Sequence, residues 1–174
     1  MLIEADKSAL LLIDVQTKLI PTIEYGDSFI ENCAWVLNLA KELAIPSFAV
    51  EHYPSGLGNT TSELAGFFDT IPAKTLFSAH ETIHIPSELS QVVIIGMEVH
   101  VCVLQTVSHL LNLGKKVFVV ADAIASANLF DAQLGIERMR FWGAEIVTKQ
   151  MLFFEWLRDA KHPQFKTLSK QFLK

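Results

Sequence analysis

Short apolar runs recur along the chain, and between them apolar residues repeat at every third or fourth position. The runs are continuous rather than alternating, which is typical of strands buried on both faces of a parallel sheet. On this pattern we expect strands at 8–13, 47–50, 92–95, 117–120 and 145–147, with 73–76 as a weaker sixth strand.

The stretches between these runs have helical spacing. The first has one apolar stripe made of Ile30, Cys33, Leu37, Ala40 and Ala44. Its expected N-cap is Asp27 or Ser28. Further helices are expected at 103–111, 132–143, 151–160 and 164–173. Because strands and helices alternate, we predict a three-layer α/β/α sandwich with a mostly parallel, roughly six-stranded sheet, in a single domain of residues 1–174.

Composition excludes several classes of protein. The 174 residues are 51% hydrophobic and 19% charged, which is a globular composition with a large core. The formal net charge is −5 and no basic run exceeds two residues, so we expect neither nucleic acid nor an anionic membrane as a partner.

The N-terminal residues and the two cysteines bear on location. No basic region precedes the first apolar run, acidic residues stand at Glu4 and Asp6, and we expect no signal peptide. The longest apolar runs are far short of the roughly 20 residues that a membrane span needs. Two cysteines cannot form a disulfide framework, and reduced thiols fit a cytoplasmic protein.

The predicted architecture restricts where chemistry can occur. In open α/β sheets, sites lie beyond the carboxyl ends of the strands. Polar residues that directly follow the predicted strands are therefore candidates: Asp14, Glu51, His52, the segment 96–102 and Asp122.

Cys102 has the most informative position among these candidates. It follows the strand at 92–95 and a short loop, where the next helix begins. A thiol at a helix N-terminus faces unpaired N–H groups and the positive end of the dipole, and we expect both to favour the thiolate. The same amides could hold the oxyanion formed when a thiolate attacks a carbonyl. Cys33 lies in the middle of an apolar stripe and is interpreted as an inert buried residue.

Three segments form a combined motif: Leu12-Ile13-Asp14-Val15-Gln16, Lys74 followed by Phe77-Ser78, and Gly96-Met97-Glu98-Val99-His100-Val101-Cys102-Val103. Together they resemble the isochorismatase-like cysteine hydrolases, a superfamily that includes nicotinamidases, N-carbamoylsarcosine amidohydrolase and isochorismatase. Four further segments match as well: 51–58, 120–123, 137–140 and 159–163. These resemble the subgroup called isochorismatase domain-containing proteins.

The resemblance implies a Rossmann-like isochorismatase fold and a catalytic triad of Asp14, Lys74 and Cys102. Cys102 would attack a carbonyl carbon to form a thioester, Asp14 would carry the proton, and Lys74 would favour both the carboxylate and the thiolate. It also implies a cis peptide bond at Met97–Glu98. That bond would turn the backbone N–H of Glu98 toward that of Cys102 to form an oxyanion hole.

Departures from the superfamily patterns narrow the expected reaction. Isochorismatase lacks a cysteine at the nucleophile position, so Cys102 favours an amide-type substrate. Metal-containing nicotinamidases carry an Asp-x-His…His cluster after the second strand, whereas this chain has Glu51-His52-Tyr53-Pro54 without a following histidine. We therefore expect no metal and no cofactor, and nicotinamide is a poor candidate for the substrate.

A group of residues near the predicted site could line a substrate pocket, or could simply pack. These are Gln16, Leu19, His52, Tyr53, Phe77 and His100. The phenylalanine-rich C-terminal part is interpreted as core that could also cover a subunit contact. Because relatives commonly form dimers or larger assemblies, we expect a homo-oligomer.

Two further features are interpreted as non-functional. His80-Glu81-Thr82-Ile83-His84 matches the zinc-protease motif, but its β-branched residues and the nearby Pro86 favour a loop over the helix that the motif requires. Asp122 is expected to fix its own loop by local backbone hydrogen bonds.

These observations predict a cysteine-dependent hydrolase that cleaves the C–N bond of a small amide or related carbonyl compound through a thioester. The alternatives are a non-catalytic metabolite-binding or scaffold protein on the same fold, and a thiol redox sensor at Cys102. A metalloprotease that uses His80 and His84 is a third alternative.

Overall fold

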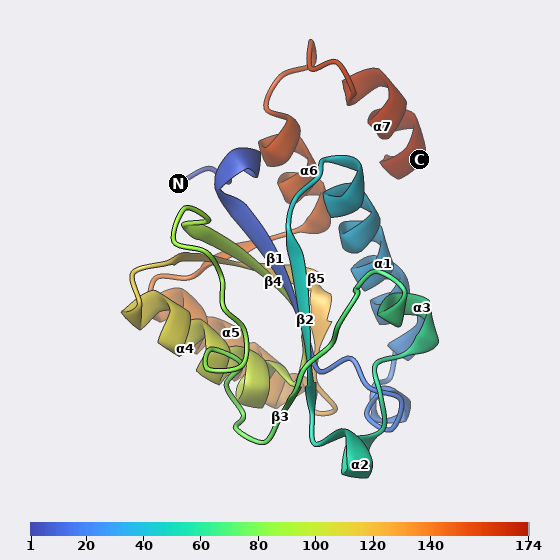
Figure 1. The fold of residues 1–174 in the computed structure, drawn as a ribbon, viewed down its shortest axis with the longest axis vertical. Helices are drawn as coiled ribbons and strands as arrows, with labels where there is room; N and C mark the ends of the chain where they lie inside the picture. The colour runs from blue at the N-terminus through green and yellow to red at the C-terminus, as the bar shows by residue number, and fades with distance from the viewer. Residues whose placement is uncertain (174) are drawn as a thin grey trace.

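A computed structural model describes residues 1–173, and their strands form one parallel sheet in the order β3-β2-β1-β4-β5-β6 (Figure 1). The strands are β1 (Ser8–Ile13), β2 (Ser47–His52), β3 (Ala73–Lys74), β4 (Gln91–Met97), β5 (Lys116–Ala125) and β6 (Glu145–Val147). The predicted fold class is confirmed.

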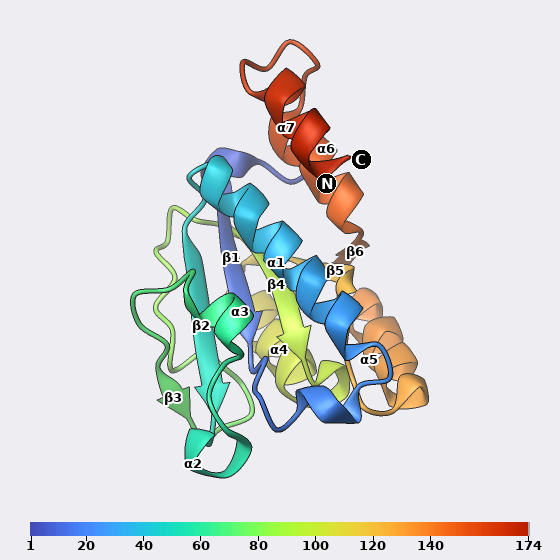
Figure 2. The same cartoon turned by 90° about the vertical axis from the view of Figure 1, so that its right-hand side faces the viewer.

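Helices cover both faces of the sheet. One face carries α1 (Gly26–Glu42), α6 (Lys149–Leu157) and α7 (Phe165–Phe172), and the other carries α4 (Leu104–Asn112) and α5 (Leu129–Phe141). Figures 1 and 2 show these two layers on either side of the strands. Short elements complete the chain: η1 (Ala5–Lys7), η2 (Ile20–Thr22), α2 (Pro54–Leu57), α3 (Ser62–Ala65) and the π-helical turn η3 (Val99–Val103).

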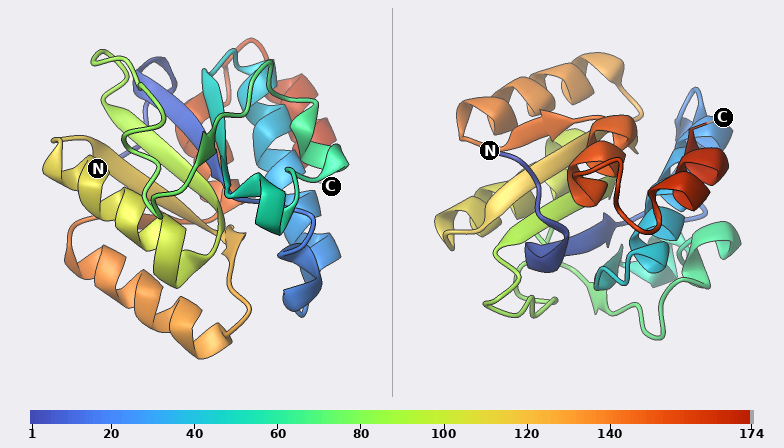
Figure 3. Two further views of the ribbon diagram at one scale, coloured as in Figure 1. Left: turned by 60° about the horizontal axis from the view of Figure 1, so that its bottom comes forward. Right: turned by 90° about the horizontal axis from the view of Figure 1, so that it is seen from above.

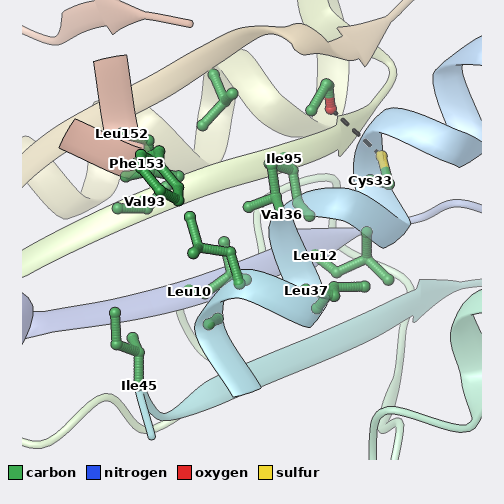
Figure 4. Close-up of a cluster of buried hydrophobic side chains, with 14 of the residues drawn as sticks. Leu10, Leu12, Cys33, Val36, Leu37, Ile45, Val93, Ile95, Leu152 and Phe153 are labelled. Carbon is green, nitrogen blue, oxygen red and sulfur yellow. Dashed lines mark hydrogen bonds between the residues drawn. The ribbon is translucent and has the colours of Figure 1, made fainter. Parts of the chain in front are cut away.

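The continuous apolar runs form strands here because each strand except the two-residue β3 has two cores to fill. In β1, Leu10 and Leu12 point into the core beneath α1, whereas Leu11 and Ile13 point into the core beneath α4. Figure 4 shows the α1-side cluster, in which the Cys33 thiol donates a hydrogen bond to the backbone carbonyl of Ala123 (3.5 Å). Cys33 is fully buried, as the sequence interpretation required.

Several boundaries differ from the sequence predictions: β2 continues to His52, β3 ends at Lys74, β4 continues to Met97 and α5 begins at Leu129. The N-cap of α1 is Tyr25, so Asp27 and Ser28 are not caps, and Asp27 lies within the first turn, where its charge favours the helix dipole. Strand β5 continues to Ala125 instead of ending at 120, so Asp122 lies inside a strand.

The order of the strands creates a crevice. The chain runs outward from β1 through β2 to β3, then returns to the other side of β1 and continues through β4, β5 and β6. The direction reverses between β1 and β4, and ligands in such folds bind at the carboxyl ends of the strands on either side of this switch point. Asp14 follows β1 and Cys102 follows β4, so both flank this point.

Among residues 1–173, the structure contains no helix with both the length and the apolar composition required to span a membrane.

Candidate active site

Asp14 is the first residue beyond β1, and its backbone is left-handed (φ 53°). Aspartate is one of the few non-glycine residues enriched in this region. Its N–H donates to the carbonyl of Val50 (3.2 Å) in the neighbouring strand, and its carbonyl accepts from the N–H of Gln16 (2.9 Å). These bonds fix the carboxyl group at the switch point of the sheet.

Lys74 ends β3 and forms a buried ion pair with Asp14. Its Nζ lies 2.7 Å from Asp14 Oδ2, and each of the two side chains is 1% exposed. The ammonium group also donates to the backbone carbonyls of Leu76 (3.3 Å) and Phe77 (2.9 Å). Its three donors therefore meet three acceptors, which is the arrangement that a buried charge requires.

Asp14 has one oxygen left over. Oδ2 accepts from Lys74, but Oδ1 is buried and has no hydrogen-bond partner within residues 1–173. Buried carboxylate oxygens in native proteins are rarely unpaired, and such an exception calls for an explanation. This atom is available to accept a proton from a neighbouring group.

Cys102 lies in η3, the π-helical turn between β4 and α4, and is 6% exposed. The peptide bond Met97–Glu98, at the end of β4, is cis, as the family resemblance implied. The Glu98 carbonyl accepts from the N–H groups of Val101 (3.2 Å) and Val103 (3.1 Å), which shapes the turn. The Glu98 N–H donates to no other group within the described part of the chain, so this amide is available to a ligand.

Gly96 allows β4 to approach β1 at the site. Its φ is +125°, and a Cβ built there would lie 2.1 Å from the carbonyl oxygen of Ile13. Any other residue would clash with the backbone of β1 directly before Asp14. The glycine therefore allows the turn that carries Cys102 to sit beside Asp14.

Burial controls the protonation of the site. Burial is the largest of the influences that raise the pKa of the Cys102 thiol to about 12; the charge of Asp14 acts in the same direction, while Lys74 opposes both. Burial also raises the pKa of Asp14, and the charge and hydrogen bond of Lys74 are the largest influences that oppose this rise. The rise in the thiol pKa runs against the expected preference for the thiolate, because a desolvated thiol beside a carboxylate binds its proton more tightly.

The structure assigns two of the six predicted pocket residues to packing. Gln16 is fully buried, and its amide nitrogen donates to the carbonyls of His52 (3.0 Å) and Gly58 (2.5 Å) while its oxygen accepts from the His52 N–H (2.7 Å). Its polar atoms are thus occupied in holding two loops together. Leu19 packs against the α1-side core.

His52, Tyr53 and Phe77 lie at the carboxyl edge of the sheet near Lys74. The rings of His52 and Phe77 are 5.3 Å apart, and both Tyr53 and Phe77 are exposed. The Tyr53 N–H donates to the carbonyl of Lys74 (2.9 Å). These three side chains could form an aromatic rim around the site.

His100 is partly exposed and is held by a residue that the sequence analysis missed. Its Nδ1 lies 3.1 Å from Ser126 Oγ, which also accepts from the Val99 N–H (2.9 Å). Carboxylates of Glu98 (3.6 Å) and Asp131 (4.0 Å) flank the ring. Ser126 follows β5, so the carboxyl-end rule would have found it had the end of β5 been predicted correctly.

The remaining candidates have other roles. His80 to His84 lie in turns and irregular chain, and the His80 ring stacks on that of His109 (4.0 Å), so the helix that the zinc-protease motif needs is absent there. Within residues 1–173, no three His, Cys, Asp or Glu side chains are grouped as metal ligands. Asp122 Oδ1 accepts from the Lys149 N–H (2.9 Å) and its carbonyl accepts from Asn32 (2.6 Å), so the predicted local loop role is wrong.

Residues 8–151 match the family model described as Isochorismatase domain. The chain belongs to the isochorismatase family. Isochorismatase domain-containing protein 2A of Mus musculus is 36% identical over 169 residues, which cover 95% of this chain and 82% of that protein. This isochorismatase-family chain therefore resembles the subgroup that the sequence analysis identified.

Solved structures share the family fold. The MAR1 ribonuclease of Caenorhabditis elegans superposes with a TM-score of 0.91 at 32% identity, covering 100% of this chain and 93% of that one. The YcaC protein of Escherichia coli, described as an octameric hydrolase of unknown specificity, has a TM-score of 0.83 at 22% identity and covers 99% and 96% of the two chains. The isochorismatase-family hydrolase fold is thus established for this chain.

Proposed function

We propose that this protein hydrolyses the C–N bond of a small amide through a thioester on Cys102, with Asp14 as the proton carrier. The observation that carries the proposal is that the two oxygens of the Asp14 carboxyl group have different surroundings. One oxygen is bound to Lys74, and the other is buried, has no hydrogen-bond partner within residues 1–173 and lies near the Cys102 thiol, whose pKa is raised.

The raised pKa values suit this chemistry. A thiol whose pKa is about 12 needs a base within the site, because bulk water at neutral pH removes its proton too rarely. Burial raises the pKa of Asp14, which brings its basicity closer to that of the thiolate and makes proton transfer less unfavourable. Lys74 limits this rise through its charge and its hydrogen bond, and both favour the carboxylate.

The proposed reaction has two halves. Asp14 Oδ1 takes the thiol proton as Sγ bonds to the carbonyl carbon, and the resulting oxyanion is bound by the backbone N–H groups of Glu98 and Cys102. Asp14 then protonates the nitrogen as the C–N bond breaks, and the amine leaves. Water next attacks the thioester while Asp14 accepts one of its protons, and that proton returns to the sulfur as the acid is released.

The surroundings favour a small substrate with an apolar acyl group. Cys102 lies in an apolar cluster beneath α4, and the partly exposed rings of His52, Tyr53 and Phe77 lie at the carboxyl edge of the sheet. We propose that these rings form the entrance. A flat, neutral acyl group fits such a rim better than a charged one.

Similarity to the MAR1 ribonuclease of Caenorhabditis elegans favours a second candidate activity, cleavage of RNA. A formal net charge of −5 argues against it, because proteins that bind RNA generally neutralise its phosphates with basic residues. An assay with single-stranded RNA distinguishes the two activities. Ribonuclease activity that survives Cys102→Ala would require a site other than the one proposed here.

Release of ammonia or amine from a panel of small amides tests the proposal. The wild type is expected to release amine from at least one compound, and the Cys102→Ala variant from none. Cys33→Ala is the matched control, because it removes the second thiol, which is buried in the α1-side core. Equal rates for wild type and Cys102→Ala would refute the proposed mechanism.

A further inference from the structure

A cavity of about 500 Å³ lies beside the outer edge of β5, and none of the triad residues lines it. Strand β6 pairs with β5 only as far as Val120, whereas β5 continues to Ala125. Residues of α1 and of α5 both line the cavity, although these helices cover opposite faces of the sheet. Figure 3 (left) shows the start of α1 (blue) and α5 (orange) on either side of the end of β5. The cavity therefore lies where β6 has ended and β5 has not.

The local sequence leaves this space open. The segment 121–127 reads Ala-Asp-Ala-Ile-Ala-Ser-Ala, so most of its side chains are small. Phe29 of α1 and Ile136 of α5 supply apolar walls. Small-molecule sites typically have volumes of roughly 300–1,000 Å³, with apolar walls and a few polar groups. This cavity fits that description.

The charged side chains at the cavity are mostly acidic. Glu24, Asp122 and Glu137 line it, against Arg140 as the one basic residue among its lining side chains. Arg140 forms no ion pair within residues 1–173. Concave surfaces lined by one sign of charge attract ligands of the opposite sign. The excess of carboxylates therefore favours a cation.

Asp122 offers an unoccupied acceptor in the cavity wall. Its Oδ1 accepts from the backbone N–H of Lys149 (2.9 Å), and its backbone carbonyl accepts from Asn32 Nδ2 (2.6 Å). Its Oδ2 has no hydrogen-bond partner within residues 1–173. The ammonium group of Lys149 donates to Asn32 Oδ1 instead and lies 5.5 Å from the centre of the Trp35 ring. Asp122 Oδ2 is therefore held in place and available to a ligand.

We propose that this cavity is a second small-molecule site, which binds an organic cation with a primary ammonium group on a flat apolar body. The ammonium group donates to Asp122 Oδ2, and the apolar body lies between Phe29 and Ile136. Charge-assisted hydrogen bonds of this kind are about twice as strong as neutral ones. The site goes beyond the proposed reaction and does not depend on it.

The cavity shares a wall with the turn that carries Cys102. Ser126 lines the cavity, and its Oγ accepts from the Val99 N–H (2.9 Å) and lies 3.1 Å from Nδ1 of His100. The backbone amide signals of Ser126 and Val99 in an NMR spectrum are therefore expected to shift when a cation occupies the cavity.

Isothermal titration calorimetry near neutral pH, with three probes of one shape, tests the charge preference. Tryptamine is the cation, tryptophol its neutral analogue and indole-3-propionate its anionic analogue. Tryptamine is expected to bind with a dissociation constant below about 1 mM, and at least about tenfold more tightly than either analogue. Cys102→Ala should bind it equally well, which separates this site from the proposed reaction. Absence of binding, or equal binding of the three probes, would overturn the proposal.

Asp122→Asn tests the ammonium contact. The amide keeps an oxygen for the Lys149 N–H but loses the charge, and the dissociation constant of tryptamine is expected to rise at least about tenfold. Asp6→Asn is the matched control, because Asp6 is exposed and lies in η1, at the amino end of the sheet. Equal weakening in both variants, or in neither, would contradict a contact with Asp122.

Ser28→Trp tests the location. Ser28 is an exposed residue of α1 that lines the cavity, so the indole ring is expected to fill the space and abolish tryptamine binding. Asn38→Trp is the matched control, because Asn38 is exposed on the same helix but does not line the cavity. Circular dichroism verifies that each variant is folded. Binding that survives in Ser28→Trp, or that leaves the NMR signals of Ser126 and Val99 in place, would put the probe elsewhere and overturn the proposal.

Discussion

Replacement of Lys74 by methionine leaves the buried Asp14 carboxylate without its counter-charge. The ammonium group is 2.7 Å from Asp14 Oδ2, and both side chains are 1% exposed, so water cannot replace it. Removal of one member of such a pair typically costs about 3–5 kcal/mol, and we expect Lys74→Met to lower the free energy of unfolding by this amount near pH 8.

The free energy of unfolding that Lys74→Met loses is expected to increase as the pH rises. Burial already raises the pKa of Asp14 above its ordinary value of 3.8, and loss of Lys74 removes the largest opposing influence. A carboxyl group with a raised folded-state pKa stabilises the fold at low pH, and this contribution is lost as the pH rises through that pKa. Between pH 3.8 and the raised pKa, each unit rise in pH is expected to lower the free energy of unfolding of the variant by about 1.4 kcal/mol.

Urea denaturation between pH 4 and pH 8 measures this effect. Lys115→Met is the control, because Lys115 donates to the carbonyls of Pro86 and Leu89 and has no carboxylate partner within residues 1–173. The free energy of unfolding that this variant loses should be the same at every pH. The free energy of unfolding lost by the double variant Asp14→Asn/Lys74→Met should be smaller, by at least about 2 kcal/mol, than the sum of the losses in the two single variants. A Lys74→Met variant with pH-independent stability, or strictly additive losses, would refute the reasoning.

The strands other than β3 could be predicted because each fills two cores. The predicted ranges 8–13 and 145–147 match β1 and β6 to the residue. The end of β5 was missed because Asp122 interrupts its apolar run. In the structure, that residue is accommodated by hydrogen bonds with Asn32 and Lys149, which come from α1 and the start of α6. Because these partners are far from Asp122 in the sequence, the residues around it do not show that the strand continues.

The site was predicted less completely than the fold. Position after a strand and family resemblance together identified Asp14, Lys74 and Cys102, and the structure brings Asp14 and Lys74 into contact. The raised pKa of the Cys102 thiol could not be predicted, because the burial of this residue depends on tertiary packing rather than on its place before α4. The role of Gln16 could not be predicted for the same reason, because the hydrogen bonds of its amide group to His52 and Gly58 form only when the chain has folded.

Three further predictions follow from the geometry of the site. Asp14→Asn should lower the rate of amide hydrolysis at least about 100-fold while the protein stays folded, because the amide cannot accept the thiol proton; a rate within a few-fold of wild type would exclude Asp14 as the carrier. Alkylation of Cys102 by iodoacetamide in the Cys33→Ala background should rise about tenfold per pH unit from pH 7 to 9, since its pKa is about 12; a plateau near pH 8 would contradict the raised pKa. Gly96→Ala should lower the free energy of unfolding by roughly 3 kcal/mol or more in a urea titration, because its Cβ would lie 2.1 Å from the Ile13 carbonyl; an unchanged stability would show that β4 does not approach β1 this closely.

The most direct test of the proposed chemistry is intact-protein mass spectrometry, with peptide mapping, after rapid acid quenching of the protein mixed with a panel of small amides and their ester analogues. The account predicts an acyl-sized mass increase in the wild type that maps to Cys102, is absent from Cys102→Ala and is retained in Cys33→Ala. Turnover of a substrate without any such adduct, or an adduct that persists in Cys102→Ala, would contradict a thioester on this residue.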